Sequence, residues 1–131
     1  SPRLRLHENL IEVHPQATLA RLVGGVLERS LRQSESERLW ELRKRVLTRL
    51  TEGLRFDFVW PEVVVRSPHV FDAVIAGYTA FLWASEGWRG PADLVGAGAS
   101  AALQEAVEGL DRLWLEDGWI WAPPAEGARD V

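Results

Sequence analysis

Two carboxylates lie in segments of the sequence that are otherwise apolar. Glu12 interrupts the apolar run 10–13, and Asp72 lies near the start of the long apolar stretch 67–88. An ionised carboxylate is costly to bury without a partner, so a charge at either position needs an explanation. One explanation is a magnesium or manganese site, because these ions bind carboxylate oxygens and water, and a substrate phosphate completes their shell. Such sites in phosphodiesterases take their carboxylates from elements that are far apart in sequence.

Each carboxylate also has an ordinary structural explanation. Asp72 can stabilise a helix N-terminus through the helix dipole, and Glu12 can be a strand residue that faces solvent. His14 follows Glu12 by two residues and so shares its strand face. It can orient a water or a phosphate, or it can be a hydrogen-bonded structural histidine. The residue types alone leave both interpretations open.

A basic segment suggests a possible partner. Arg43, Lys44 and Arg45 are consecutive, and the first 50 residues carry ten basic against six acidic side chains, whereas the remainder is acidic. Nucleic acid is one partner for such a patch, through phosphate contacts without a sequence preference. A solvated helix face is the other interpretation, because acidic residues interleave with the cations at helical spacing: Glu35, Glu37 and Glu41.

Composition and motifs exclude several classes of protein. The chain has 131 residues, 47% of them hydrophobic and 26% charged, which is typical of one globular domain. It has no cysteine, so it has neither a disulfide nor a thiolate metal site, and we expect a cytoplasmic protein. No apolar run is long enough to span a bilayer. Motifs for phosphate loops, dinucleotide binding, zinc proteases and serine hydrolases are absent.

The periodicity and the breakers predict an α/β domain in which helices dominate. Ser67-Pro68 resembles a helix cap followed by proline at the first helical position, and the helix it opens is apolar nearly all round, which predicts a buried helix. Consecutive β-branched residues predict a strand after Pro61. We expect helices at 15–23, 37–52, 68–85 and 100–115, and short strands at 9–14, 62–66 and 119–122. An all-helical bundle is the alternative. One domain covers 1–123, and 124–131 is a flexible tail.

Three motifs, in order, support a resemblance to a known family. The segment 11–19 reads I-E-V-H-P-Q-A-T-L, the segment 71–84 reads F-D-A-V-I-A-G-Y-T-A-F-L-W-A, and the segment 116–123 reads E-D-G-W-I-W-A-P, with Asp117 an insertion or substitution. They resemble the Glu-x-[Tyr/His]-Pro segment, the Asp-Ala helix and the closing Glu-Gly-x-Ile-x-x-Pro segment of domain-of-unknown-function family 429. Members of that family are predicted ribonuclease-H-like nucleases.

The resemblance implies a fold and an activity. It implies a ribonuclease-H-like core in which Glu12 and Asp72 bind Mg²⁺ or Mn²⁺ for phosphodiester hydrolysis of nucleic acid. His14 is then a candidate catalytic residue, and Arg43, Lys44 and Arg45 are candidate phosphate contacts. The three-stranded meander that opens that fold, and the Asp on its first strand, have no counterpart here. The chain is therefore expected to be a fragment, one half of a split protein or a reduced relative that has lost catalysis.

That expectation has consequences for partners. An incomplete sheet exposes an edge, so we expect a homo-oligomer or a complex with the missing N-terminal half, and no membrane partner. The rival hypothesis for function is a non-catalytic protein-interaction module or subunit. Its surface would be the basic helix 38–49, or the region of Trp88 and Trp119 to Trp121, because tryptophan is enriched at protein interfaces.

Overall fold

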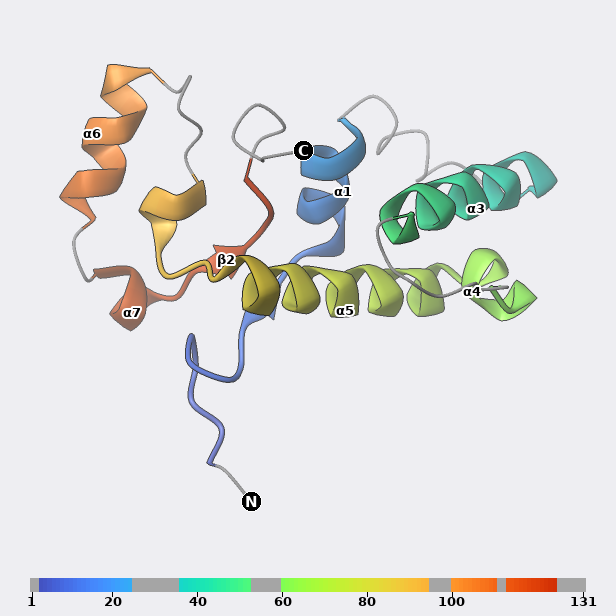
Figure 1. The fold of residues 1–131 in the computed structure, drawn as a ribbon, viewed down its shortest axis with the longest axis horizontal. Helices are drawn as coiled ribbons and strands as arrows, with labels where there is room; N and C mark the ends of the chain where they lie inside the picture. The colour runs from blue at the N-terminus through green and yellow to red at the C-terminus, as the bar shows by residue number, and fades with distance from the viewer. Residues whose placement is uncertain (1–2, 25–35, 53–59, 95–99, 111–112, 125–131) are drawn as a thin grey trace.

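The structure, a computed structural model, describes residues 3–24, 36–52, 60–94, 100–110 and 113–124 (Figure 1). Helices make up most of the described chain, and two short strands are also present. In chain order the elements are β1 (Glu12–Val13), α1 (Pro15–Val23), α3 (Glu37–Thr51), α4 (Glu62–Arg66), α5 (Pro68–Glu86), the 3-10 helix η1 (Pro91–Leu94), α6 (Ala101–Gly109), α7 (Leu113–Asp117) and β2 (Ile120–Trp121).

Helix α5 is the central element, and its ends are defined by the residues the sequence predicts. The Ser67 hydroxyl oxygen accepts a hydrogen bond from the Val70 N–H at 3.3 Å, and Pro68 occupies the first turn, where no donor is needed. Gly87 ends the helix in the left-handed conformation, with φ of 69°, and its N–H bonds the Trp83 carbonyl. The helix is 19 residues long.

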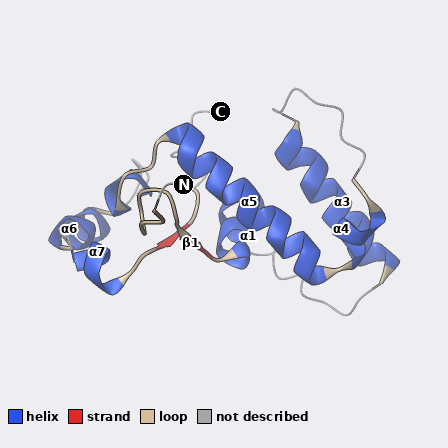
Figure 2. Cartoon of the chain, turned by 90° about the horizontal axis from the view of Figure 1, so that it is seen from below, coloured by secondary structure: helices blue, strands red, loops and turns tan. Residues whose placement is uncertain are grey.

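The other elements are distributed along α5. Helices α3 and α4 lie at its N-terminal end, α6 and α7 lie beyond its C-terminal end, and α1 crosses it near the middle (Figures 1 and 2). The first hydrophobic core fills the space between α1, α3, α4 and the first half of α5; its buried members are Leu19, Leu39, Val46, Leu47, Val64, Val65, Phe71 and Ile75. A second core forms around Trp121 at the other end, with Leu82 and Trp88.

Only one face of α5 is covered within the described chain. Residues Phe71, Ile75, Thr79 and Leu82 are buried and recur at helical spacing. The opposite face is exposed, and it carries His69, Ala73, Gly77 and Phe81. The Phe81 side chain is 49% exposed. The prediction of a helix buried all round is therefore correct for half of its circumference.

The two strands form a parallel sheet, which distinguishes the fold from the all-helical alternative. Glu12 pairs with Ile120, and Val13 pairs with Trp121. Both strands are shorter than the expected ranges 9–14 and 119–122. The helix-rich α/β class predicted from the sequence is confirmed, with a sheet that consists of two short strands in the described chain.

The segment 62–66 is a helix, and the prediction of a strand there is wrong. Pro61 precedes α4 at its cap position, and Glu62 favours the first turn through the helix dipole. Val64 and Val65 are buried by packing on α3 and α5. Burial on one side of a short helix therefore outweighs the β propensity of three consecutive valines.

The expected single helix 100–115 is two helices, α6 and α7. The prediction of one continuous helix is wrong here: Gly109 is the last residue of α6, and glycine has a low helix propensity. The predicted tail lies outside the described residues except for Pro124, which is buried. No helix in the described chain is both long and apolar enough to cross a membrane.

Candidate functional site around Asp72

Asp72 lies in the second turn of α5 and is partly buried. The helix cap at Ser67 and Pro68 fixes where α5 begins. Asp72 is the next residue after Phe71, which is part of the first core. Asp72 therefore lies beside the core but not inside it. A carboxylate at this position is partly removed from water while it remains accessible.

The surroundings of Asp72 act on its pKa in opposite directions. Partial burial raises the pKa of Asp72 above its usual value of 3.8, because desolvation disfavours the charged form. The nearby positive charges of Arg43, His69 and His14 act against this rise, in that order of strength. Burial is the larger effect. A carboxyl group with a raised pKa and cationic neighbours is typical of functional sites, although ion-pair networks in the core produce the same signal.

His14 lies at the start of α1, close enough for its charge to act on Asp72. Its Nδ1 accepts a weak hydrogen bond from the Ala17 N–H at 3.4 Å and so caps the helix. The ring is exposed, and this bond occupies only Nδ1. His14 therefore has the structural role that the sequence leaves open. Since Nδ1 accepts only when the ring proton is on Nε2, the Nε2–H group is the one that can donate to a phosphate oxygen or a water.

His69 is the residue at this site that the sequence analysis missed. It precedes Asp72 by three residues on α5, is exposed, and its charge acts on the Asp72 carboxyl. Residues three apart on a helix share a face, so the spacing in S-P-H-V-F-D was the available signal. The charges of His69 on α5 and of His14 at the N-cap of α1 thus both act on this one carboxyl group.

Unlike His14, Glu12 has no resolved electrostatic effect on Asp72. It is exposed on β1, opposite Ile120, and β1 packs against α5. Glu12 is not among the groups whose charges act on Asp72. Within the described chain its carboxylate has no hydrogen bond or ion pair. The charge of His14 therefore acts on Asp72, whereas Glu12 lies on β1 with its side chain in solvent.

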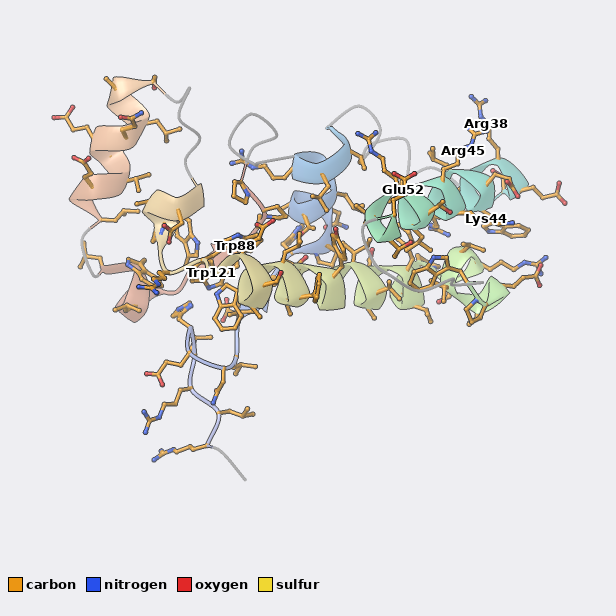
Figure 3. All side chains as sticks on the ribbon, in the orientation of Figure 1. Arg38, Lys44, Arg45, Glu52, Trp88 and Trp121 are labelled. Carbon is orange, nitrogen blue, oxygen red and sulfur yellow. The ribbon has the colours of Figure 1, made fainter. Side chains whose placement is uncertain are left out.

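The three consecutive basic residues of α3 differ in burial: Arg43 is buried, whereas Lys44 and Arg45 are on the surface. Arg43 is only 3% exposed; its Nη1 donates to the Val65 carbonyl at 2.8 Å, and its guanidinium lies 5.5 Å from the centre of the Phe71 ring. Lys44 and Arg45 are exposed. Figure 3 shows Arg45 on the outer side of α3 together with Arg38. Arg43 therefore differs from its expected place on a surface patch, because successive residues of a helix point in directions about 100° apart.

The tryptophan region is a core and not an open surface. Trp121 is completely buried and Trp88 is 6% exposed, which corrects the expectation that this region forms the surface of an interaction module (Figure 3). The Trp121 Nε1–H donates to His7 Nδ1 at 2.9 Å, and Trp88 stacks on Trp121 with ring centres 6.5 Å apart. These contacts join the N-terminal segment, the end of α5 and β2.

The donor set near Asp72 falls short of a complete metal site. Among the described residues, no group of three or more His, Asp or Glu side chains could hold a metal ion. Asp72 and His69 have the right donor atoms for a divalent ion, whereas His14 carries its ring proton on Nε2 while its Nδ1 accepts the cap bond. The cationic Arg43 opposes such a site. The described residues alone therefore do not complete a metal site.

Comparison with known proteins identifies one family. The model of the family described as "Protein of unknown function (DUF429)" matches residues 2–98. The matched range includes β1, α1, α3, α4 and α5, and therefore the whole surroundings of Asp72. No significant match was found among curated proteins or among solved structures.

Proposed function

This chain belongs to the DUF429 family, and from that membership and the surroundings of Asp72 we propose that it supplies part of a metal-dependent nuclease site. The proposed reaction is phosphodiester hydrolysis of nucleic acid, as in ribonuclease-H-like enzymes. In this proposal Asp72 and Glu12 are carboxylate ligands of Mg²⁺ or Mn²⁺. Further ligands come from outside the described residues, in an assembled site.

The observation that supports the proposal is the position of Asp72. It is a partly buried carboxylate whose pKa is raised by burial, and the charges of His69 and His14 act on it. Burial disfavours the charged form of this side chain, so the charge has a cost in stability. Sites that bind a cation keep such carboxylates because the ion compensates the cost.

The chain's own residues have distinct roles in the proposed site. When bound, a divalent ion supplies charge neutralisation at the phosphate and an activated water. Asp72 and Glu12 provide anionic oxygens. His14, held by its cap at Nδ1, presents Nε2 toward a phosphate oxygen or a water, and His69 adds a second imidazole. Lys44 and Arg45 bind the phosphate backbone without sequence preference.

A cleavage assay with matched control variants tests the proposal. Labelled nucleic acid is incubated with Mg²⁺ or Mn²⁺ and the wild-type chain, Asp72→Asn or Glu12→Gln. The controls carry the same changes at exposed acidic residues away from the site: Asp93→Asn on η1 and Glu105→Gln on α6. Loss of metal-dependent cleavage in the first pair alone supports the proposal. Cleavage that persists in both site variants, or persists with a chelator, contradicts it.

A second candidate function is a protein-interaction subunit, and the exposed face of α5 favours it. Ala73, Gly77 and Phe81 form an apolar strip with no cover in the described chain. In this proposal the strip packs against a second copy, or against a polypeptide that carries the first strands of the ribonuclease-H-like fold. Sedimentation tests it: Phe81→Glu is expected to dissociate an assembly that the exposed-site change Leu103→Glu leaves intact. A clean monomer at high concentration contradicts association of the chain with itself.

A further inference from the structure

An arginine lies stacked on a tryptophan at the junction of α4 and α5. The Arg66 guanidinium is 4.5 Å from the centre of the Trp40 ring, and the Arg66 side chain is 52% exposed. The guanidinium also pairs with Glu62 Oε1 at 3.1 Å. The central carbon of the guanidinium therefore lies over one face of the indole, and more than half of the Arg66 side chain remains accessible to solvent.

Buried contacts hold the two partners in place. Trp40 packs against the first core from α3. One turn further along α3, Arg43 donates to the carbonyl of Val65, the residue before Arg66. This bond is buried and charge-assisted, and such bonds are among the stronger ones in proteins. The tryptophan and the arginine are thus positioned by two helices that are tied together directly beside them.

The helix that carries Trp40 also carries cationic residues. Lys44 follows Trp40 by four residues, so the two share a helix face, and Lys44 is exposed. Five of the fifteen residues of α3 are basic and two are acidic. Exposed basic residues on other faces of α3 are Arg38, Arg45 and Arg49. A polyanion that approaches α3 therefore meets cationic groups next to a stacked planar group.

We infer that Arg66, backed by Trp40, is a stacking platform for a base of single-stranded nucleic acid, with Lys44 binding the adjacent phosphate. Bases stack on aromatic rings and on arginine guanidinium planes when the strand is unpaired. In a duplex the faces of the bases are covered by their neighbours, so a platform of this kind selects single strands. The inference rests on the proposed nuclease function, whose substrate form it names: Arg66 ends α4, and His69 and Asp72 lie in the first two turns of the next helix, α5.

A binding assay in chelator, where no metal-dependent cleavage occurs, tests the platform. Fluorescence anisotropy compares a labelled single strand with a duplex of the same sequence. Arg66→Gln is expected to weaken single-strand binding by about fivefold or more. Arg66→Lys keeps the charge but removes the plane, so it is expected to weaken binding to a similar degree. Lys44→Gln is expected to reduce the slope of log affinity against log salt by about 0.7.

Two further variants separate the platform from a general charge effect. Arg89→Gln removes an exposed arginine just beyond the other end of α5, about 30 Å away at 1.5 Å per helical residue, and is expected to leave binding unchanged. Glu62→Gln removes the carboxylate that pairs with Arg66 and is expected to strengthen binding by up to about fivefold. A gain of affinity cannot result from misfolding. Thermal melting checks that Arg66→Lys is folded.

The outcomes distinguish this inference from the proposed nuclease. Equal affinity for duplex and single strand, wild-type binding by Arg66→Lys, or equally tight binding of an acidic peptide overturns the platform. Single-strand binding that depends on Arg66, in a chain that never cleaves with any metal, supports the platform and contradicts nuclease activity of the chain by itself. Metal-dependent cleavage that requires Asp72 but does not depend on Arg66 supports the nuclease and contradicts the platform.

Discussion

The hydroxyl groups of Thr18 and Thr79 are hydrogen-bonded to each other at 2.8 Å, and both residues are completely buried. This bond joins α1 to the centre of α5. The Thr79 hydroxyl also donates to the Ile75 carbonyl at 2.8 Å. Since a hydroxyl has one hydrogen, Thr79 accepts at the contact between the helices and Thr18 donates.

The direction of this bond predicts unequal effects of two similar substitutions. Thr79→Val removes the acceptor for Thr18 and leaves a buried donor without a partner, which costs about 1–3 kcal/mol. Thr18→Val leaves Thr79 with its bond to Ile75, so a smaller loss is expected. Urea unfolding of both single variants and the double variant measures the difference. If the two hydroxyls are coupled, the double variant loses less unfolding free energy than the two single variants lose in total. A loss equal to or larger than that total would contradict the coupling.

Arg43 is expected to act in stability and not as a phosphate contact. Arg43→Ala removes a buried, charge-assisted bond to the Val65 carbonyl and the packing of the side chain on Phe71. Loss of such a bond costs about 1.5–3 kcal/mol. Lys44→Gln, at an exposed position, is expected to change unfolding by less than about 0.5 kcal/mol. Denaturant unfolding of the two variants gives the comparison, and equal stabilities would show that the buried contact is unimportant.

Asp72 is expected to make the folded protein less stable at neutral pH. Burial raises its pKa in the folded chain above 3.8, so the folded state holds the proton more tightly than the unfolded state. The contribution of Asp72 to stability therefore falls as pH rises from about 3.8 through the raised pKa. Asp72→Asn should be slightly more stable than wild type at pH 7, and this difference should disappear below pH 3.8.

Thermal melting across this pH range, with Asp93→Asn as the control, measures the effect. The Asp93 carboxylate accepts the N–H groups of Arg89 and Gly90 at 2.7 and 3.0 Å, and amides are weaker acceptors than carboxylates. This control is therefore expected to be less stable than wild type at pH 7. If Asp72→Asn also lowers the melting temperature at pH 7, the carboxylate stabilises the fold and the argument from burial fails.

The contact between Trp121 and His7 is expected to hold the N-terminal segment on the second core. Trp121→Phe removes the N–H donated to His7 Nδ1 and leaves space in a completely buried position. We expect a loss of about 2 kcal/mol or more. Ile120→Val, next to it but 52% exposed, is expected to have little effect. Faster amide exchange at 5–10 in Trp121→Phe alone would show that the segment has been released.

Local signals in the sequence predicted the helices well and the contacts between them poorly. The Ser67-Pro68 start and the Gly87 end of α5 follow from rules that act within one turn. The valine run of α4 was mistaken for a strand because its helical state depends on burial against α3 and α5, which no local pattern contains. The exposed side of α5 was missed for the same reason, since alanine and glycine suit both a buried and an open face.

The candidate site was predictable in part. Asp72 was identified as a charge in an apolar segment, and His14 by its place next to Glu12. That Arg43 faces the core depends on the packing of α3 against α4 and on its contact with Phe71 of α5. His69 could be identified only from its helical spacing to Asp72 together with the position of α1, which carries His14 at its cap. These relationships depend on tertiary packing, which a single sequence does not specify.

The most direct test of the central claim is Mn²⁺ titration observed through the histidine side chains. The chain has three histidines, so their imidazole resonances can be assigned by single substitutions. Paramagnetic Mn²⁺ broadens signals of nearby nuclei, and we predict selective broadening of His14 and His69, with loss of the effect in Asp72→Asn. His7, which lies against Trp114 and Trp121, serves as the internal control. Broadening of all three signals alike, broadening of none, or the same pattern in Asp72→Asn would contradict a divalent-ion site at Asp72.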